Sequence, residues 1–181
     1  MSIRIRPATD ADADGIFRLY RETARTPGGL AREEDEITAD YVSSNLKRAL
    51  RRGVSLVAET DPSGPAGDGG GIVGEIHCSV PEPRVFRHVL SDLTIAVLPA
   101  FQGRRIGHAL FSALLEHVRR NMPHILRVEL VARESNARAV ALYEKLGFRR
   151  EGRMERRIGG VSGRLEADIP MAWLNGESAE E

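Results

Sequence analysis

Apolar residues recur along the chain with two periods, one typical of strands and the other of helices. Apolar residues at helical spacing predict helices after Thr9, after Thr38, from Ile106 and over residues 136–145. Alternating or short continuous apolar runs predict strands over residues 3–6, 54–58, 72–80, 93–98, 125–131, 148–158 and 164–173. Interspersed strands and helices predict an α/β (α+β) protein with a mixed sheet of about seven strands.

The stretch over residues 93–117 predicts a strand, a turn and a helix in close succession. Pro99 ends the strand, since proline has no N–H for a ladder, and a turn with two glycines precedes a helix from Ile106. The first N–H groups of a helix lack intrahelical partners, and with the helix dipole they favour an anion. Arg104 and Arg105 add positive charge. The pattern predicts an anion-binding turn, although a purely structural turn fits it equally well.

A second block of residues, 135–148, predicts a capped helix. Ser135 or Asn136 can cap its start, and Gly147 can adopt the left-handed conformation that commonly follows the end of a helix. Asn136 and Tyr143 lie seven residues apart, so they share one face of the helix, two turns from each other. An amphipathic helix explains the apolar spacing but leaves this pairing of an amide with a phenol unexplained.

The two blocks together resemble the GNAT superfamily of N-acyltransferases. The residues from Val97 to Gly107 resemble its acyl-CoA pyrophosphate loop, Gln/Arg-x-x-Gly-x-Gly/Ala, except that Arg105 replaces the middle glycine. The N-x-x-A-x-x-L-Y-x-x-x-G-F pattern from Asn136 to Phe148 resembles the family's second block. The resemblance implies the GNAT fold: a mixed, mostly antiparallel sheet with helices on both faces and a V-shaped splay between strands 4 and 5.

The resemblance also implies acetyl-CoA as co-substrate and assigns roles to several residues. Tyr143 would be the general acid that protonates the departing CoA thiolate, Asn136 would bind near the pantetheine arm, and a backbone N–H near Val97 would stabilise the oxyanion. The implied cofactor-binding residues are Ile95, Ala96, Val97, Gln102, Gly103, Arg104, Arg105, Ile106, Gly107, His108, Ala109, Asn136 and Tyr143.

The general base is left open by the sequence. Where some family members carry a glutamate five residues before the asparagine, this chain has Val131. Glu129, Asp92 and Glu75 are the catalytic candidates, and His77 shares the face of Glu75. Taken alone, each of them is more readily explained as a surface or structural side chain than as a catalytic one.

Charge and composition narrow the class of protein. Twenty-six basic and twenty-six acidic side chains cancel, which disfavours nucleic-acid or anionic-membrane partners. No apolar run approaches the roughly 20 residues of a membrane span, no signal-peptide core follows Met1, and the single Cys78 allows no internal disulfide. These features predict a soluble cytoplasmic protein. No metal site is expected, and a homodimer is one candidate assembly.

One N-acetyltransferase domain is expected over residues 1–174, followed by a disordered acidic tail at 175–181. The Pro/Gly/Asp-rich residues 61–71 predict a flexible hairpin loop. The acidic cluster at 33–36 predicts a solvated helix start, with a role in attracting a cationic amine as the alternative.

The expected activity is transfer of an acetyl group from acetyl-CoA to a primary amine, either a small molecule or a peptide N-terminus. The amine would attack the thioester directly in a ternary complex. A non-catalytic acyl-CoA-binding or sensing module is the alternative.

Overall fold

The computed structural model describes residues 2–26, 28–60, 71–159 and 163–176. The chain forms two compact units, and each is described by itself below. Unit 1 comprises residues 1–79 and 94–114, and unit 2 comprises residues 80–93 and 115–181. Strand β4 (Val89–Val97) and helix α3 (Ile106–Asn121) contribute residues to both units.

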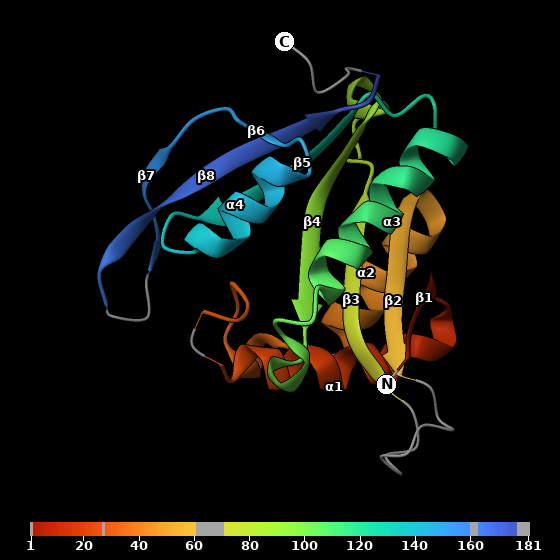
Figure 1. Ribbon diagram of the computed structural model, residues 1–181, viewed down its shortest axis with the longest axis vertical. Coiled ribbons are helices and arrows are strands. Elements are labelled where there is room, and N and C mark those ends of the chain that lie inside the picture. Colours follow the sequence, from red (N-terminus) through yellow and green to blue (C-terminus); the bar gives the residue numbers. More distant parts are fainter. Residues whose placement is uncertain (1, 27, 61–70, 160–162, 177–181) are drawn as a thin grey trace. The chain divides into compact units, whose positions relative to one another are not determined.

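Unit 1 is built on an antiparallel sheet of β1 (Ile3–Pro7), β2 (Gly53–Thr60) and β3 (Ile72–Ser79) (Figure 1). The last residues of β4 adjoin β3, where the Leu98 N–H donates to the Val73 carbonyl at 2.9 Å. The sequence-based strands at 3–6, 54–58 and 72–80 are therefore confirmed. The predicted flexible loop between β2 and β3 lies at residues 61–70, outside the described residues.

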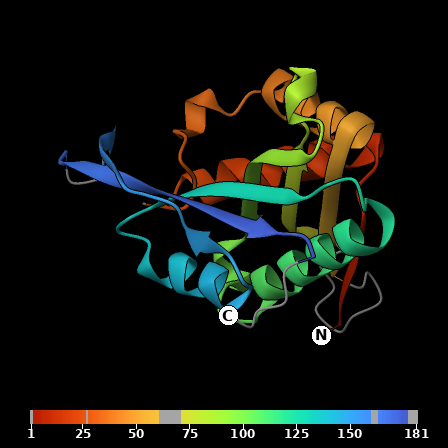
Figure 2. The ribbon, with the colours of Figure 1, turned by 90° about the horizontal axis from the view of Figure 1, so that it is seen from above.

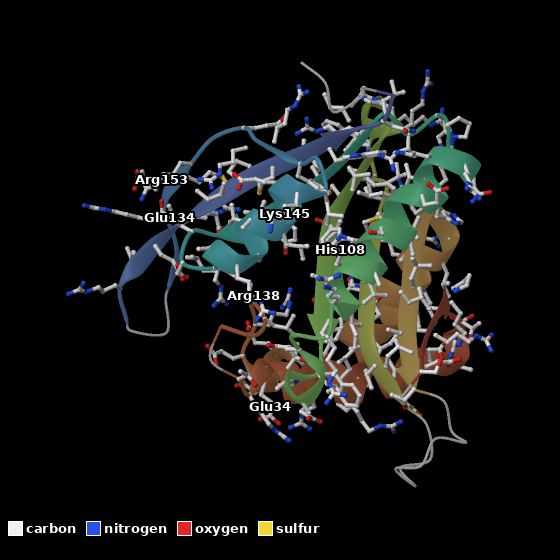
Figure 3. The ribbon with its side chains drawn as sticks, viewed as in Figure 1. Glu34, His108, Glu134, Arg138, Lys145 and Arg153 are labelled. Atoms are coloured by element: carbon white, nitrogen blue, oxygen red, sulfur yellow. The ribbon has the colours of Figure 1, made fainter. Side chains whose placement is uncertain are left out.

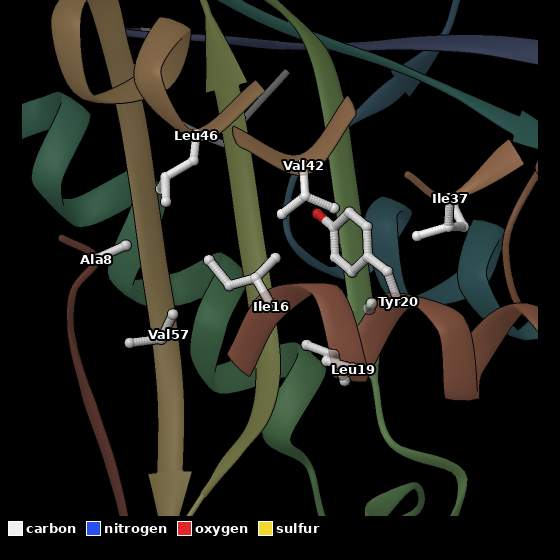
Figure 4. Packing of buried hydrophobic residues seen from close by; sticks show 9 residues of the cluster. Ala8, Ile16, Leu19, Tyr20, Ile37, Val42, Leu46 and Val57 are labelled. Atoms are coloured by element: carbon white, nitrogen blue, oxygen red, sulfur yellow. The ribbon is translucent and has the colours of Figure 1, made fainter. Parts of the chain in front are cut away.

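Helices cover both faces of the unit 1 sheet. Helix α1 (Ala13–Ala24) follows a 3-10 turn, η1 (Asp10–Asp12), and α2 (Ala39–Arg52) begins after Thr38, whose Oγ1 accepts the Tyr41 N–H at 3.1 Å. Figure 4 shows the core that these helices form on one face of the sheet, with Ile16, Leu19, Tyr20, Val42, Leu46 and Val57 in contact. The first half of α3 covers the other face, because a Cβ on Gly74 would lie 3.1 Å from Leu110 and 3.2 Å from Ile106.

An ion pair fastens the start of the chain to η1. Arg6 donates from Nη1 and Nη2 to both carboxylate oxygens of Asp12, at 2.8 Å each, and from Nε to Glu59 at 2.8 Å. The hydrogen bonds from Arg6 lower the pKa of Asp12 from 3.8 to about 2. A depressed carboxyl pKa stabilises the fold above the unfolded value, and this contribution is lost as the pH falls through about 2.

Unit 2 combines a parallel and an antiparallel pairing. The start of β4 pairs in parallel with β5 (Arg127–Arg133), with Val89 opposite Arg127 and Leu90 opposite Val128. Strand β8 (Leu165–Leu174) runs antiparallel to β5 and also pairs with β6 (Arg149–Arg150) and β7 (Met154–Gly159). Helix α4 (Ala137–Lys145) packs on one face of this sheet (Figure 2).

Two strands differ from the sequence-based expectation. The single strand expected over 148–158 is wrong, because β6 and β7 are separate, and Arg156 in β7 has a φ of 53°, where the register with β8 shifts. Strand β4 begins at Val89 rather than at residue 93, and Asp92 within it has a φ of 53°. The β4–β5 pairing in unit 2 stops at Leu90, two residues before Asp92, which agrees with the expected splay of strands 4 and 5.

The expected disordered tail lies largely at residues 177–181, outside the described residues. In the part of the chain that the structure describes, no helix combines the length and apolar character that crossing a membrane requires.

Substituting Gly53 by alanine is expected to destabilise unit 1. A Cβ at Gly53 would lie 2.0 Å from the Cys78 carbonyl oxygen and 2.7 Å from the Ser79 Cα, and neither backbone atom can move independently of β3. Overpacking of this kind costs about 1–3 kcal/mol. Gly71→Ala is the matched control, since a Cβ there meets nothing within 4 Å. Denaturant unfolding should separate the two variants; equal stabilities would contradict the packing described here.

Candidate active site

The end of β4 lies between the sheet core and the first turn of α3, all within unit 1. Ala96 is buried in the same apolar cluster as Tyr20 and Val57. Ile95 points to the opposite face, where its Cδ1 lies 3.8 Å from the position that a Cβ on Gly107 would take. The three expected cofactor-strand residues, with Val97 as the last of β4, therefore adjoin the turn that leads into α3.

The turn is fixed to the strand by hydrogen bonds. The Phe101 N–H donates to the Leu98 carbonyl at 2.8 Å, closing the 3-10 turn η4 (Pro99–Phe101). The Gln102 side-chain amide then donates from Nε2 to the Val97 carbonyl at 3.1 Å. Gln102 is expected to bind the cofactor. In this structure its side chain also has a structural role, because it ties the turn to the last residue of β4.

Two residues of the turn have left-handed backbone conformations. Gly103 has a φ of 79°, and Arg105 has a φ of 61°. A non-glycine residue in this region costs roughly 1–2 kcal/mol. The position at which the sequence resemblance anticipates glycine is therefore one that needs glycine-like geometry, and Arg105 adopts that geometry despite its side chain.

The first turn of α3 presents backbone donors and positive charge. The helix begins at Ile106, and the Ala109 N–H is bonded to the Arg105 carbonyl at 3.0 Å. The N–H groups of residues 106–108, the first three of the helix, have no intrahelical acceptor. His108 projects from the same turn (Figure 3), while the Arg104 guanidinium lies 5.1 Å from the centre of the Phe101 ring. An anion is favoured at this helix terminus.

Asn136 and Tyr143 both lie in unit 2, on α4. Asn136 caps the helix through Oδ1, which accepts the Ala139 N–H at 3.1 Å, so its amide oxygen already has a structural role. Tyr143 is half-buried, and burial raises the pKa of its phenol to about 12. Gly147 ends the helix with a φ of 92°, as the sequence predicts.

Two of the candidate bases, Glu129 and Asp92, also belong to unit 2. Glu129 accepts a hydrogen bond from Arg127 Nε at 2.8 Å, and the same guanidinium binds Glu151. Glu129 is thus already engaged in a structural ion pair. Asp92 is exposed in its left-handed position on β4, and Val131 is exposed on β5. A strained backbone of this kind is more frequent at functional sites than elsewhere.

The third candidate, Glu75, belongs to a buried polar cluster in unit 1. Tyr20 donates its hydroxyl to Glu75 Oε2 at 2.5 Å, and Ser55 donates to Glu75 Oε1 at 2.9 Å. His77 Nδ1 lies 3.2 Å from each carboxylate oxygen and 3.0 Å from the Tyr20 hydroxyl. All four side chains are buried, with Glu75 only 1 % exposed. We call these four residues the Glu75 cluster.

The sequence indicated only half of this cluster. Glu75 and His77 stand out as polar residues on one face of an apolar strand, whereas Tyr20 reads as part of the apolar stripe of α1. Each polar group buried without a partner would cost roughly 1–3 kcal/mol, so four polar groups persist here because they satisfy one another. A tyrosine rather than phenylalanine in the helical stripe was the available signal.

The acidic cluster at 33–36 forms a 3-10 turn, η2 (Glu34–Glu36). Glu34 Oε1 accepts hydrogen bonds from Arg21 at 2.5 Å and from Arg25 at 2.8 Å. The hydrogen bond from Arg25 is the main cause that lowers the pKa of Glu34, and the one from Arg21 adds to it. In unit 2, Glu134 and Arg153 form a similar exposed pair (Figure 3). Among the described residues, no group of three His, Cys, Asp or Glu side chains is arranged to hold a metal ion.

Comparison with known proteins gives a consistent result. The model of the acetyltransferase (GNAT) family matches residues 14–148. The N-alpha-acetyltransferase RimI of Mycobacterium tuberculosis (strain ATCC 25618 / H37Rv) is 44 % identical over 70 residues, which span 39 % of this chain and 40 % of that protein.

Solved structures with the same fold include two with acetyl-CoA. The phosphinothricin acetyltransferase of Sinorhizobium meliloti, in complex with AcCoA, superposes with a TM-score of 0.80 at 23 % identity, covering 100 % of this chain and 93 % of that one. The structure of yncA from Salmonella typhimurium with its cofactor acetyl-CoA gives a TM-score of 0.80 at 20 % identity, covering 99 % and 98 %. At these identities the likeness shows the fold, and the expected mixed, mostly antiparallel sheet is confirmed. The parallel pair in it is β4 with β5.

Replacing Arg105 by glycine is expected to leave the fold intact or to stabilise it slightly. Glycine removes a left-handed penalty of roughly 1–2 kcal/mol, while its greater freedom in the unfolded chain costs about 0.5–1 kcal/mol. The opposite change at the other left-handed residue, Gly103→Ala, should destabilise by about 1 kcal/mol. Urea unfolding of both variants tests whether Gly103 and Arg105 have left-handed backbone conformations. If Arg105→Gly is the more destabilising of the two, the backbone geometry of the turn is wrong.

Proposed function

Because the chain belongs to the acetyltransferase (GNAT) family, we propose that it transfers the acetyl group of acetyl-CoA to a primary amine. The acceptor would be a small molecule or a peptide N-terminus, and the curated relative that shares 44 % identity over 70 residues is an N-alpha-acetyltransferase. The observation that carries the proposal is the turn from Gln102 to Gly107, which leaves the first N–H groups of α3 open at the end of β4.

The residues of the turn fit the pyrophosphate of acetyl-CoA. That group carries negative charge, and the α3 terminus offers backbone donors with the Arg104 and Arg105 side chains nearby in sequence. Gly107 lacks a side chain at the first turn, so a phosphate can approach the backbone closely. Each exposed contact at a helix terminus is worth roughly 0.3–1 kcal/mol, so binding depends on several donors acting together. When bound, acetyl-CoA supplies an activated thioester.

The proposed reaction is a direct displacement. The acceptor arrives as an ammonium ion and first loses a proton, which gives its nitrogen a free electron pair. The nitrogen attacks the carbonyl carbon; a C–N bond forms, the C–S bond breaks, and the sulfur leaves with the electron pair. A second proton leaves the nitrogen as the amide forms, and the thiolate gains one. The sum is an acetamide, free CoA thiol and one proton released to solvent.

Tyr143 is the proposed partner of the leaving thiolate. Its raised pKa of about 12 keeps the phenol protonated throughout the physiological range. Complete transfer to a thiolate whose acid has a pKa near 8.5 would be uphill by about 3.5 pKa units, or roughly 5 kcal/mol. The phenol therefore acts mainly by donating a hydrogen bond to the developing anion. Such a bond to a charged group is worth about 1.5–3 kcal/mol, equivalent to roughly 10- to 150-fold in rate.

The wider proposal places this activity in one domain over residues 1–174 of a cytoplasmic enzyme. Cys78 is buried as a free thiol, and burial raises its pKa to about 12, so it is an unreactive core residue suited to a reducing compartment. We also propose that the enzyme forms a homodimer. Light scattering, which measures the mass of the assembly in solution, tests this.

A panel of amines tests the activity directly. Small primary amines and peptides with free N-termini are incubated with acetyl-CoA, and CoA thiol release and acetylated product are measured. Product with any of these amines supports the proposal. Binding of acetyl-CoA without turnover of any amine would favour a non-catalytic acyl-CoA sensor, and absence of binding would refute both functions.

Gly107→Glu is expected to abolish acetyl-CoA binding. The new side chain adds bulk and negative charge at the helix terminus proposed to hold the phosphates. Gly107→Ala is the matched control, because a Cβ there lies 3.8 Å from Ile95 Cδ1, an ordinary contact, and should change affinity by only a few-fold. Titration calorimetry of both variants measures the difference. Wild-type affinity in Gly107→Glu would rule out this turn as the phosphate site.

Tyr143→Phe is expected to slow acetyl transfer by roughly 10- to 150-fold, the value of a hydrogen bond to the leaving thiolate. The ring is retained, so stability should change by no more than about 0.5–1.5 kcal/mol and acetyl-CoA affinity by only a few-fold. Single-turnover measurement with an accepted amine isolates this step from product release. Equal rates in wild type and variant would show that the hydroxyl has no role in the reaction.

A further inference from the structure

The Glu75 cluster forms one connected unit from three elements of unit 1. Tyr20 comes from α1, Ser55 from β2, and Glu75 and His77 from one face of β3. The Tyr20 and His77 rings stack with an interplanar angle of 24°. Both carboxylate oxygens of Glu75 accept hydrogen bonds from hydroxyl groups. The carboxylate is therefore held in place from two sides.

The contacts of the cluster define which nitrogen of His77 carries a proton. Nδ1 faces three oxygen atoms, the two of Glu75 at 3.2 Å and the Tyr20 hydroxyl at 3.0 Å. An ionised carboxylate can only accept, and the Tyr20 hydroxyl already donates its hydrogen bond to Glu75. Nδ1 must therefore donate, which leaves Nε2 as the nitrogen with a free electron pair.

The cluster lies directly beside the strand that is proposed to hold the thioester. Strands β3 and β4 are neighbours in the sheet, and just after the end of β4 the Leu98 N–H donates to the Val73 carbonyl of β3. Ala96 packs in the same apolar cluster as Tyr20, so the Glu75 cluster and the end of β4 share one face of unit 1. The His77 side chain keeps 6 % of its surface exposed, compared with 1 % for Glu75.

We propose that His77 accepts, at Nε2, the proton that the acceptor ammonium loses before it attacks the thioester, with Glu75 as its positioning residue. This inference rests on the acetyl transfer proposed above. The small exposed surface of His77 requires that the proton arrive through a bridging water rather than by direct contact. The nitrogen of the ammonium keeps the electron pair, the imidazole becomes an imidazolium hydrogen-bonded to the Glu75 carboxylate, and the proton returns to solvent after turnover.

The surroundings of His77 suit this role. The titratable groups facing the imidazole are Tyr20 from α1 and Glu75 from β3; Tyr41 of α2 interacts with Tyr20, and Cys78 of β3 interacts with Glu75. Glu75 supplies the negative charge that stabilises an imidazolium, whereas Glu129 has an arginine that already neutralises it. Imidazole is the side chain that most often serves as a general acid or base in proteins.

Nitrogen NMR of histidine-labelled wild-type protein tests the geometry without any substrate. The neutral His77 should show the tautomer protonated at Nδ1. His77→Asn assigns the signal, and His124→Asn, at an exposed histidine, is the matched control. A neutral His77 protonated at Nε2 would overturn the proposal whatever the activity of the variants.

Single-turnover kinetics across pH 5–9 tests the role. In His77→Asn an amide nitrogen can still donate to Glu75, but no titratable nitrogen is left, so the rate at pH 7 should fall by about 100-fold or more and the acid limb of the profile should disappear. Acetyl-CoA affinity should stay within a few-fold. Glu75→Gln should retain activity with a displaced acid limb, and His124→Asn, at an exposed histidine, should leave the limb unchanged.

Failure of the two proposals can be told apart. If wild-type protein acetylates no amine of the panel, acetyl transfer itself fails, and the role of His77 fails with it. If wild type is active and His77→Asn keeps its rate and profile, or if Asp92→Asn rather than His77→Asn abolishes the acid limb, only the assignment of His77 is overturned.

Discussion

The hydrogen bonds at the end of β4 determine where α3 begins. Leu98 is bound to β3 through its N–H, and Gln102 reaches back to the Val97 carbonyl, so the chain leaves the sheet at a defined point. From there it has only Gly103, Arg104 and Arg105 with which to turn into a helix that starts at Ile106. So short a connection requires left-handed residues, and two of the three have a positive φ. The open N–H groups of α3 are a consequence of this geometry.

The fold was predictable wherever burial leaves a regular apolar pattern in the sequence. Short apolar runs mark β2 and β3, which are buried on both faces, and the period of 3.6 marks α1 and α2, which are buried on one face. Prediction failed where the backbone departs from regular geometry. Asp92 in β4 and Arg156 in β7 have left-handed conformations that are normally signalled by glycine, so nothing in the local sequence marked the irregular strands.

The candidate site divides in the same way. The turn at Gln102–Gly107 and the capped helix with Asn136 and Tyr143 were predictable, because each is a local pattern whose residues act through neighbouring backbone. The Glu75 cluster was not, since Tyr20 and Ser55 join Glu75 from 55 and 20 residues away in the chain. A pairing of that kind depends on which strands and helices come together, and the spacing of apolar residues in the sequence does not specify it. The partners of Glu34 were likewise visible only in the folded chain.

The carboxylates of this protein differ most in what they are bonded to. Asp12, Glu34, Glu129 and Glu134 each accept hydrogen bonds from an arginine, whose guanidinium stays charged at every accessible pH. Such a pair holds its charge and anchors neighbouring elements, as the lowered pKa of Asp12 shows. Glu75 is bonded to two hydroxyls and an imidazole instead, and an imidazole can gain and lose a proton under ordinary conditions. A core built for stability alone would gain little from such a cluster, because apolar residues of similar volume commonly stabilise as well or better than buried charges. The chemical difference between these partners therefore separates the carboxylates that hold the fold together from Glu75, which we propose positions His77 to accept a proton.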